Sequence, residues 1–388
     1  MTGHVRRRGA RSWELKFDLG TDSLTGRRLT RFHSFKGTKR EADIELAKLV
    51  AAAATGGYTD PSKATVGEFL DRWERDWAVG NVSPKTIERY REIIKKHIKP
   101  HIGSLKVQKL RALHLQELYR KLLADGRAPG VGLAPRTVGH VHRVLHRSLG
   151  HAAQWGVVHQ NVATLLSPPP VESAEVEILR ADDVKAVLTG LRGQRLHMIA
   201  TLGLATGMRR GELLALRWKD VDFDRGRVQV EQSIETTKEG GTRFKPPKTK
   251  HGRRAITLPK STVALLRAHW KAQQEGRLAL GMGRAAADDL VFSKQEGEPL
   301  DPDAISKEWT ALIGKLNGVP KVKLHSLRHT HASQLIASGL DVLTISRRLG
   351  HSTPTITLAV YGHLFSNTDD VAAQVMEAAL TFGTDGEH

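Results

Sequence analysis

Cysteine is absent from the 388 residues of this chain, which excludes disulfide bonds, thiolate metal ligands and cysteine nucleophiles. Long apolar runs are also missing, since no stretch approaches the roughly 18 residues that a membrane-spanning helix needs. The basic residues near the N-terminus are not followed by the apolar segment of a secretory signal. We therefore expect a cytoplasmic protein that does not enter a membrane.

Acidic residues are scarce beside basic ones: 60 lysines and arginines outnumber 41 aspartates and glutamates, giving a formal net charge of +19. Residues 1–64 hold 13 basic and 7 acidic residues, residues 65–168 hold 17 and 8, and the remainder holds 30 and 26. Each phosphate neutralised by a basic side chain releases condensed counterions, so this charge favours nucleic acid as the partner. A basic amphipathic helix that would favour a membrane surface does not stand out.

Two breaks divide the chain into three modules. The first is the run from Gly56 to Pro61, and the second is the triple proline Pro168–Pro170, which cannot continue a helix. We predict a multidomain fold: a small α+β domain over residues 1–62, an all-α bundle over 64–168, and a mostly α domain with a small antiparallel β-sheet over 174–388.

The first module alternates apolar and polar residues at period two, which is typical of strands. A second run ends near Phe35, and Thr38 with Glu41 forms the capping box of a helix that follows. The apolar positions of the first run are Trp13, Leu15, Phe17 and Leu19. The pattern predicts a β-sheet with one helix, and by itself it also suits a plain accessory domain.

The second module has the period of helices. Ser83 and Pro84 supply an N-cap and a first-turn proline, and three segments then carry apolar residues at helical spacing, with arginines and lysines between them. No carboxylate joins the histidines of the third segment at ligand spacing, so we expect solvated or phosphate-facing side chains and no metal site. These histidines are His140, His142, His146 and His151.

The third module gathers basic residues and a tyrosine at predicted helix ends. Gly207 permits a tight turn that sets Arg209 beside a buried helix face. His325 and Arg328, three positions apart, share one face of another helix. The further members are Lys248 or Lys250 on a predicted hairpin (Val228 to Ile234, then Ala255 to Leu258), His351 and Tyr361.

Such a set suits phosphodiester transfer without a metal ion. Arginines can clamp the nonbridging oxygens and neutralise the charge of the transition state. A tyrosine can act as the nucleophile and keep the bond energy in an ester, while a lysine protonates the departing oxygen. Taken alone, Arg209 would be a surface residue and Tyr361 a core residue, so the interpretation depends on the whole ordered set.

The ordered set resembles the catalytic signature of the tyrosine recombinases, the family of phage integrases and Xer-type recombinases. The resemblance implies that Arg209 and Arg328 bind the scissile phosphate and that Tyr361 attacks it, forming a covalent 3′-phosphotyrosine. Lys248 would protonate the 5′ oxygen, and its Lys-Thr pair favours it over Lys250, which stays a rival.

The remaining site residues also take their roles from the resemblance, which spans residues 176–365. His325 would assist as general base, and His351 would hydrogen-bond the phosphate. Glu212, one helical turn after the first arginine, would orient the site. No metal and no cofactor is implied.

The resemblance further implies a site-specific DNA recombinase that integrates or excises a mobile element, acting as a homotetramer on attachment sites in double-stranded DNA. Residues 1–62 would bind arm-type DNA, residues 64–168 would be the core-binding domain, and a last helix from Asp369 would pack on a neighbouring protomer. A DNA-bending host factor and an excisionase are candidate accessory partners. Such a protein would lie at the nucleoid.

Three alternatives differ in what they leave unexplained. A Xer-like enzyme that resolves dimers would share the chemistry, but two domains suffice for that task and the extra basic module argues against it. A non-catalytic DNA-binding regulator would give no reason for Arg209, Arg328, His351 and Tyr361. A metal-dependent nuclease would need a carboxylate cluster or a His-Glu-x-x-His run, and the sequence has neither.

Overall fold

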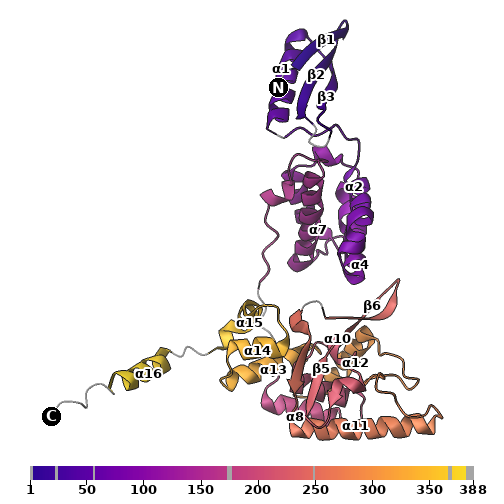
Figure 1. Cartoon of the computed structure of the whole chain (residues 1–388), viewed down its shortest axis with the longest axis vertical. Helices are drawn as coiled ribbons and strands as arrows, with labels where there is room; N and C mark the ends of the chain where they lie inside the picture. Colours follow the sequence, from indigo (N-terminus) through magenta and orange to yellow (C-terminus); the bar gives the residue numbers. More distant parts are fainter. Residues whose placement is uncertain are drawn as a thin grey trace, which may run out of the picture. The chain divides into compact units, whose positions relative to one another are not determined.

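The computed structural model of the protein describes residues 3–21, 25–55, 57–172, 177–247, 250–365 and 369–381. The chain divides into two units, Met1–Glu172 and Ser173–His388 (Figure 1). The predicted fold class is confirmed: the fold is multidomain and mostly helical, with small antiparallel sheets. Among the described residues, no helix is both long and apolar enough to cross a bilayer.

The first unit begins with an antiparallel sheet in the order β1 (Gly3–Gly9), β2 (Ser12–Thr21) and β3 (Arg28–Lys36). Helix α1 (Lys39–Ala54) packs on β1 and β2, where Leu15 and Phe17 are fully buried. Thr38 and Glu41 form the predicted capping box. The alternation of apolar and polar residues does not predict strand β1, because only Val5 in this strand is even partly buried.

A helical bundle follows in the same unit. Ser83 accepts a hydrogen bond from the backbone N–H of Thr86 at the start of α4, as predicted for an N-cap. One apolar core joins the bundle, and it includes the fully buried Trp73. The elements are α2 (Val66–Trp73), η1 (Glu74–Ala78), α3 (Val79–Asn81), α4 (Pro84–Ile93), η2 (Ile94–Ile98), α5 (Lys99–Ile102), η3 (Val107–Lys109), α6 (Ala112–Asp125), α7 (Pro135–Gln154) and η4 (Val162–Leu165).

The histidines of α7 correct one prediction. His142 is buried, with its Nδ1 3.0 Å from the hydroxyl of Tyr119, and Nδ1 of His151 accepts a hydrogen bond from the indole N–H of Trp73 at 2.7 Å. His142 is therefore a buried structural residue, and the half-buried His151 also has a structural partner. The reason is that α7 packs against both α4 and α6, so its buried face is wider than a single apolar stripe.

The second unit places small sheets among helices. Its three-stranded sheet has the order β4 (Val221–Asp222), β5 (Arg227–Val230) and β8 (Arg254–Thr257), and β6 (Ser233–Thr237) pairs with β7 (Gly241–Lys245). The other elements are α8 (Ala181–Gly190), α9 (Leu196–Thr206), α10 (Arg210–Leu213), η5 (Trp218–Asp220), η6 (Lys250–Gly252), α11 (Lys260–Ala279), α12 (Pro302–Lys315), α13 (Ser326–Ala337), α14 (Val342–Leu349), α15 (Pro354–Tyr361), η7 (Gly362–Leu364) and α16 (Asp369–Thr381).

The predicted hairpin is partly wrong. Val228 pairs with Ile256 as expected, but the run from Val228 to Ile234 is two strands, β5 and β6, and β6 pairs with the unforeseen β7. The chain leaves the first sheet between them, where Gln232 donates from Nε2 to the carbonyl of Ala215 at 2.9 Å.

Two cores position the functional residues of this unit. The larger one includes residues of α9 and α13, which pack against each other. A smaller one, formed by α13, α14 and α15, consists of Ala332, Ile336, Ile345, Leu349 and Tyr361. The predicted nucleophile is therefore part of a packed three-helix cluster.

Candidate active site

Two arginines converge on the turn that ends α14. Arg328, on α13, donates from Nη1 to the carbonyl of Gly207 at 2.7 Å and from Nη2 to the carbonyl of Leu349 at 2.8 Å. Arg209 donates from Nη2 to the carbonyl of Gly350 at 3.2 Å. These carbonyls lie at the C-terminal ends of α9 and α14, where the helix dipole favours positive charge. The turn therefore holds both guanidinium groups.

The turn needs glycine at its centre. Gly350 caps α14 with a φ of +68°, a left-handed conformation that costs other L-residues about 1–2 kcal/mol. A Cβ at this position would lie 2.7 Å from Nη1 of Arg254. Helix α9 ends in the same way at Gly207, whose φ is +65°, so the predicted tight turn before Arg209 is present.

Glu212 is a buried carboxylate that binds two arginines. Its Oε1 accepts from Nη1 of Arg209 at 2.8 Å, and its Oε2 accepts from Nη2 of Arg254 at 2.9 Å and from the backbone N–H of Arg209 at 3.0 Å. Burial raises the pKa of Glu212, but the contacts with Arg254 and Arg209 outweigh burial and the pKa falls below its usual value. Arg254 itself is buried and donates from Nε to the carbonyl of Arg348 at 2.7 Å.

The cluster carries more positive than negative charge. Burial lowers the pKa of Arg328, and Arg209 and Arg254 are cations that lower it further. Glu212 is the single carboxylate that raises it. The side chain of Arg209 is 42% exposed, so an anion can reach it. A phosphate would relieve the repulsion between the two guanidinium groups and could accept hydrogen bonds from both.

A cavity of about 310 Å³ opens beside Arg209. Lys245, Pro246 and Pro247 line it, directly before the predicted Lys248, and Gly350 lines it as well. Lys248 itself lies outside the described residues. Lys250, the other candidate for the general acid, is the first residue of η6. Both lysines therefore follow Pro247 of the cavity lining closely in the sequence.

Tyr361, at the end of α15, is 1% exposed. Its hydroxyl lies 2.7 Å from Nδ1 of His329, the residue that follows Arg328 on α13. Burial raises the pKa of Tyr361 to about 12, and Arg328 opposes this rise. The phenol is therefore neutral at neutral pH and needs a proton acceptor before it can attack.

The two predicted histidines lie at the same site. Nδ1 of His351 is 2.8 Å from the hydroxyl of Thr357, and burial followed by Arg328 and Arg209 lowers the pKa of His351 to about 4. The ring of His325 meets that of His329 edge to face, with 4.9 Å between centroids. Its pKa is lowered by partial burial, by His329 and by Arg328, although the residue keeps an exposed side.

The structure thus gathers five predicted residues from α13, the two helix-ending turns and α15. They are Arg209, His325, Arg328, His351 and Tyr361. Comparison with known families gives the same part of the chain: the phage integrase family matches residues 177–368, and the N-terminal SAM-like domain of phage integrases matches residues 65–123. The chain belongs to the phage integrase family of tyrosine recombinases. It is a site-specific DNA recombinase.

Relatives of this recombinase match it over nearly its whole length. A protein named tyrosine recombinase XerC-like from Caldanaerobacter subterraneus subsp. tengcongensis is 26% identical, covering 97% of this chain and 98% of that protein. The integrase of Streptomyces ambofaciens is 29% identical, covering 96% and 94%, and the ICEBs1 integrase of Bacillus subtilis is 27% identical, covering 95% and 97%.

Solved structures share the fold of the recombinase. The Tn1549 transposon integrase in complex with a circular intermediate DNA has a TM-score of 0.67 at 20% identity, covering 82% of this chain and 100% of that one. The lambda integrase tetramer bound to a Holliday junction has a TM-score of 0.55 at 18% identity, covering 90% and 92%.

Sequence reasoning missed two residues of the recombinase site, Arg254 and His329. The sequence pattern could have indicated Arg254. In β8 the buried Arg254 and Ile256 alternate with the exposed Ala255 and Thr257, so the alternation of a strand puts this arginine on the same buried face as an isoleucine. No sequence pattern indicates His329, because only the packing of α15 on α13 brings Tyr361 to it.

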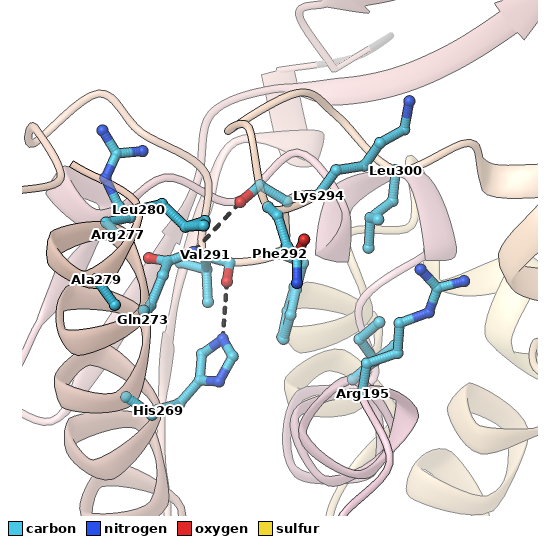
Figure 2. A pocket seen from close by; sticks show the side chains of 15 residues that line it. Arg195, His269, Gln273, Arg277, Ala279, Leu280, Val291, Phe292, Lys294 and Leu300 are labelled. Atoms are coloured by element: carbon cyan, nitrogen blue, oxygen red, sulfur yellow. Dashed lines mark hydrogen bonds between the residues drawn. The ribbon is translucent and has the colours of Figure 1, made fainter. Parts of the chain in front are cut away.

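The recombinase has another cavity, of about 510 Å³, between α11 and the segment around Val291 and Phe292 (Figure 2). His269 lies in it, with Nε2 2.8 Å from the carbonyl of Val291. None of the predicted catalytic residues that the structure describes lines this cavity, so it is separate from the arginine cluster. Within the described ranges, no group of three or more histidines and carboxylates could hold a metal ion.

Proposed function

We propose that this recombinase is the integrase of a mobile genetic element and that it cuts and rejoins DNA through a covalent 3′-phosphotyrosine at Tyr361. The observation that carries the proposal is the convergence of Arg209 and Arg328 on one turn, next to the helix that ends at Tyr361. Two forked donors and a nucleophile at one place are what phosphoryl transfer needs.

The arginines act first, as the binding site of the scissile phosphate. Arg209 and Arg328 exchange hydrogen bonds with backbone carbonyls for hydrogen bonds with two nonbridging oxygens. They oppose the charge that builds up as the fifth oxygen approaches phosphorus, and Glu212 keeps Arg209 in place. His351, neutral at neutral pH, donates a further hydrogen bond to the phosphate.

Strand cleavage then exchanges one phosphoester for another. The hydroxyl of Tyr361 gives its proton to a histidine of the site and its oxygen bonds to phosphorus, the bond to the 5′ oxygen breaks, and Lys248 gives that oxygen a proton. The ester keeps the energy of the broken bond, so a 5′ hydroxyl from the second duplex reverses the step and joins the new strand. Lys250 is the alternative acid.

The first two domains hold the DNA. We assign residues 1–62 to arm-type DNA and residues 64–168 to the core site, because both are strongly basic. On the sheet face turned away from α1, the exposed Lys16 lies with its Nζ 5.9 Å from the ring centre of Phe32, which is 61% exposed. An exposed aromatic ring with a cation beside it suits contact with nucleic acid.

The working assembly that we propose is a homotetramer on two duplexes at the nucleoid. Helix α16 exposes apolar side chains that a neighbouring protomer could cover, namely Val375, Met376 and Leu380. The structure of lambda integrase as a tetramer on a Holliday junction supports this assembly by analogy. A DNA-bending factor and an excisionase complete the proposal as accessory partners.

A Xer-like role in dimer resolution is the second candidate, favoured by the name of the XerC-like relative. The two candidates differ in the N-terminal sheet. An integrase that uses arm sites loses recombination when the outer face of this sheet is changed, whereas a dimer-resolving enzyme that needs only core sites keeps it.

A suicide substrate tests the chemistry. Nicked duplexes of random sequence are incubated with the protein in EDTA, and those captured in a denaturation-resistant complex are recovered and sequenced. We expect a covalent band that survives EDTA and is absent from Tyr361→Phe, which keeps the packing of the ring. No band from the wild-type protein, or an equal band from Tyr361→Phe, would refute the proposal.

A further inference from the structure

His329 is the hydrogen-bonding partner of the Tyr361 hydroxyl among the described residues, at 2.7 Å from its Nδ1. The resemblance to relatives assigns the general base to His325 instead. Yet His325 contacts the ring of His329, and no hydrogen bond joins it to Tyr361 within the described part of the chain. The three rings form a row, with His329 in the middle.

Exposure changes along this row. His325 is exposed, His329 is half-buried, and Tyr361 is 1% exposed. The outer imidazole is therefore open to solvent, and the inner one contacts the phenol. His325 is also close enough to Arg209 and Arg210 for their charges to act on it, which places it toward the phosphate-binding arginines.

We propose that His329, and not His325, accepts the phenolic proton of Tyr361 when the tyrosine attacks DNA. The inference rests on the proposed function, because it takes Tyr361 as the nucleophile. The O–H bond of Tyr361 breaks, an N–H bond forms at Nδ1 of His329, and the phenolic oxygen bonds to phosphorus. The 5′ oxygen leaves with a proton from the acid on its own side, so no proton is gained or lost.

The surroundings of His329 suit a proton acceptor. It is faced by Arg328 from α13, by His325 at the N-cap of that helix, by Tyr361 from α15 and by His351 from the turn before α15. Burial and then Arg328 lower the pKa of His329, so at neutral pH the ring is uncharged. Cleavage that needs this neutral ring is complete above its pKa and is lost as the pH falls through it.

The test separates proton acceptance from positioning. His329→Asn keeps an oxygen near the place of Nδ1 and so can hold the hydroxyl, but it cannot take a proton at these pH values. The substrate is the captured duplex, remade with sulfur in place of the 5′ oxygen at the mapped cleavage position. Sulfur leaves without protonation, so the rate of adduct formation reports the nucleophile alone.

We expect His329→Asn to lower this rate by about 100-fold or more, as loss of a general base does, and to remove the acid limb of the pH–rate profile. His325→Asn should retain a much higher rate on the sulfur substrate. The control is His363→Asn, an exposed histidine two residues after the tyrosine, which should match the wild type. Affinity for DNA in a gel shift and thermal unfolding should be unchanged in all three variants.

Several outcomes would overturn the inference. One is a His329→Asn rate within about threefold of the wild type. Another is an acid limb that persists in His329→Asn and disappears in His325→Asn. If His329→Asn unfolds, His329→Gln gives the same comparison with a longer amide. Failure of the wild-type protein to form any adduct would refute the proposed function itself, so the two failures are distinguishable.

Discussion

The carboxylate of Glu212 lies 2.9 Å from the guanidinium of Arg254, and the side chains are 4% and 7% exposed. This buried ion pair joins α10 to β8, which are 42 residues apart in sequence. Because Glu212 also binds Arg209, the pair fixes the position of an arginine that we propose to bind the phosphate. Arg254 is therefore a positioning residue that acts through Glu212.

Glu212→Ala should destabilise the recombinase strongly. Removing one partner of a buried pair leaves an uncompensated charge, at a cost of about 3–5 kcal/mol. The matched control is Glu308→Ala, which breaks the ion pair with Arg195, a side chain that is 55% exposed. We expect the control to cost under about 1 kcal/mol. Urea unfolding of both variants measures the difference, and equal costs would contradict the role of the buried pair.

The same pair predicts a pH dependence. The pKa of Glu212 is lower in the folded protein than in the unfolded chain, because Arg254 and Arg209 outweigh the effect of burial. The stability that this group contributes is present above its unfolded pKa, near 4.5, and is lost as the pH falls through the lower folded value. Glu212→Gln should therefore show a flatter acid decline of unfolding free energy than the wild type.

Substitution of Arg209 and Arg328, the two arginines that we propose to bind the phosphate, should have different effects on stability. Arg209→Lys removes the forked donor from a side chain that is 42% exposed, so it should lower adduct formation by a factor on the order of 10²–10³ and spare the fold. Arg328→Lys acts on a buried side chain and leaves carbonyl groups of Gly207 and Leu349 unpaired, costing about 1–3 kcal/mol as well. Adduct assays beside thermal unfolding measure both.

The sequence predicts the parts of this site that follow from helix periodicity and turn chemistry. Arg209 after Gly207 and His351 after Gly350 lie at left-handed caps, as glycine at a helix end indicates. Such patterns do not predict contacts between segments that are distant in the sequence. His329 meets Tyr361 because α13 and α15 share a core, and Arg254 meets Glu212 because β8 begins beside α10.

Gly350→Ala should disturb the site more than its backbone strain alone explains. Gly350 and Gly339 both have left-handed φ angles, +68° and +78°, but a Cβ at Gly350 meets Arg254 at 2.7 Å and one at Gly339 meets nothing within 4 Å. Gly339→Ala is thus a control for strain, at about 1–2 kcal/mol. We expect Gly350→Ala to be less stable and to lose adduct formation, whereas Gly339→Ala retains it. Similar activities would show that the close approach of Arg254 is unimportant.

The N-terminal sheet should contribute to DNA affinity through charge and through an aromatic ring, and the two contributions are separable. Lys16→Ala removes one cation and should reduce the slope of log affinity against log salt by about 0.9. Phe32→Ala should weaken binding without changing that slope, because the lost contact is uncharged. The control is Ile44→Ala, an exposed apolar residue on α1. Affinities for a random-sequence duplex over a salt series measure all three, and a Lys16→Ala slope equal to that of the control would place the DNA on another face of the domain.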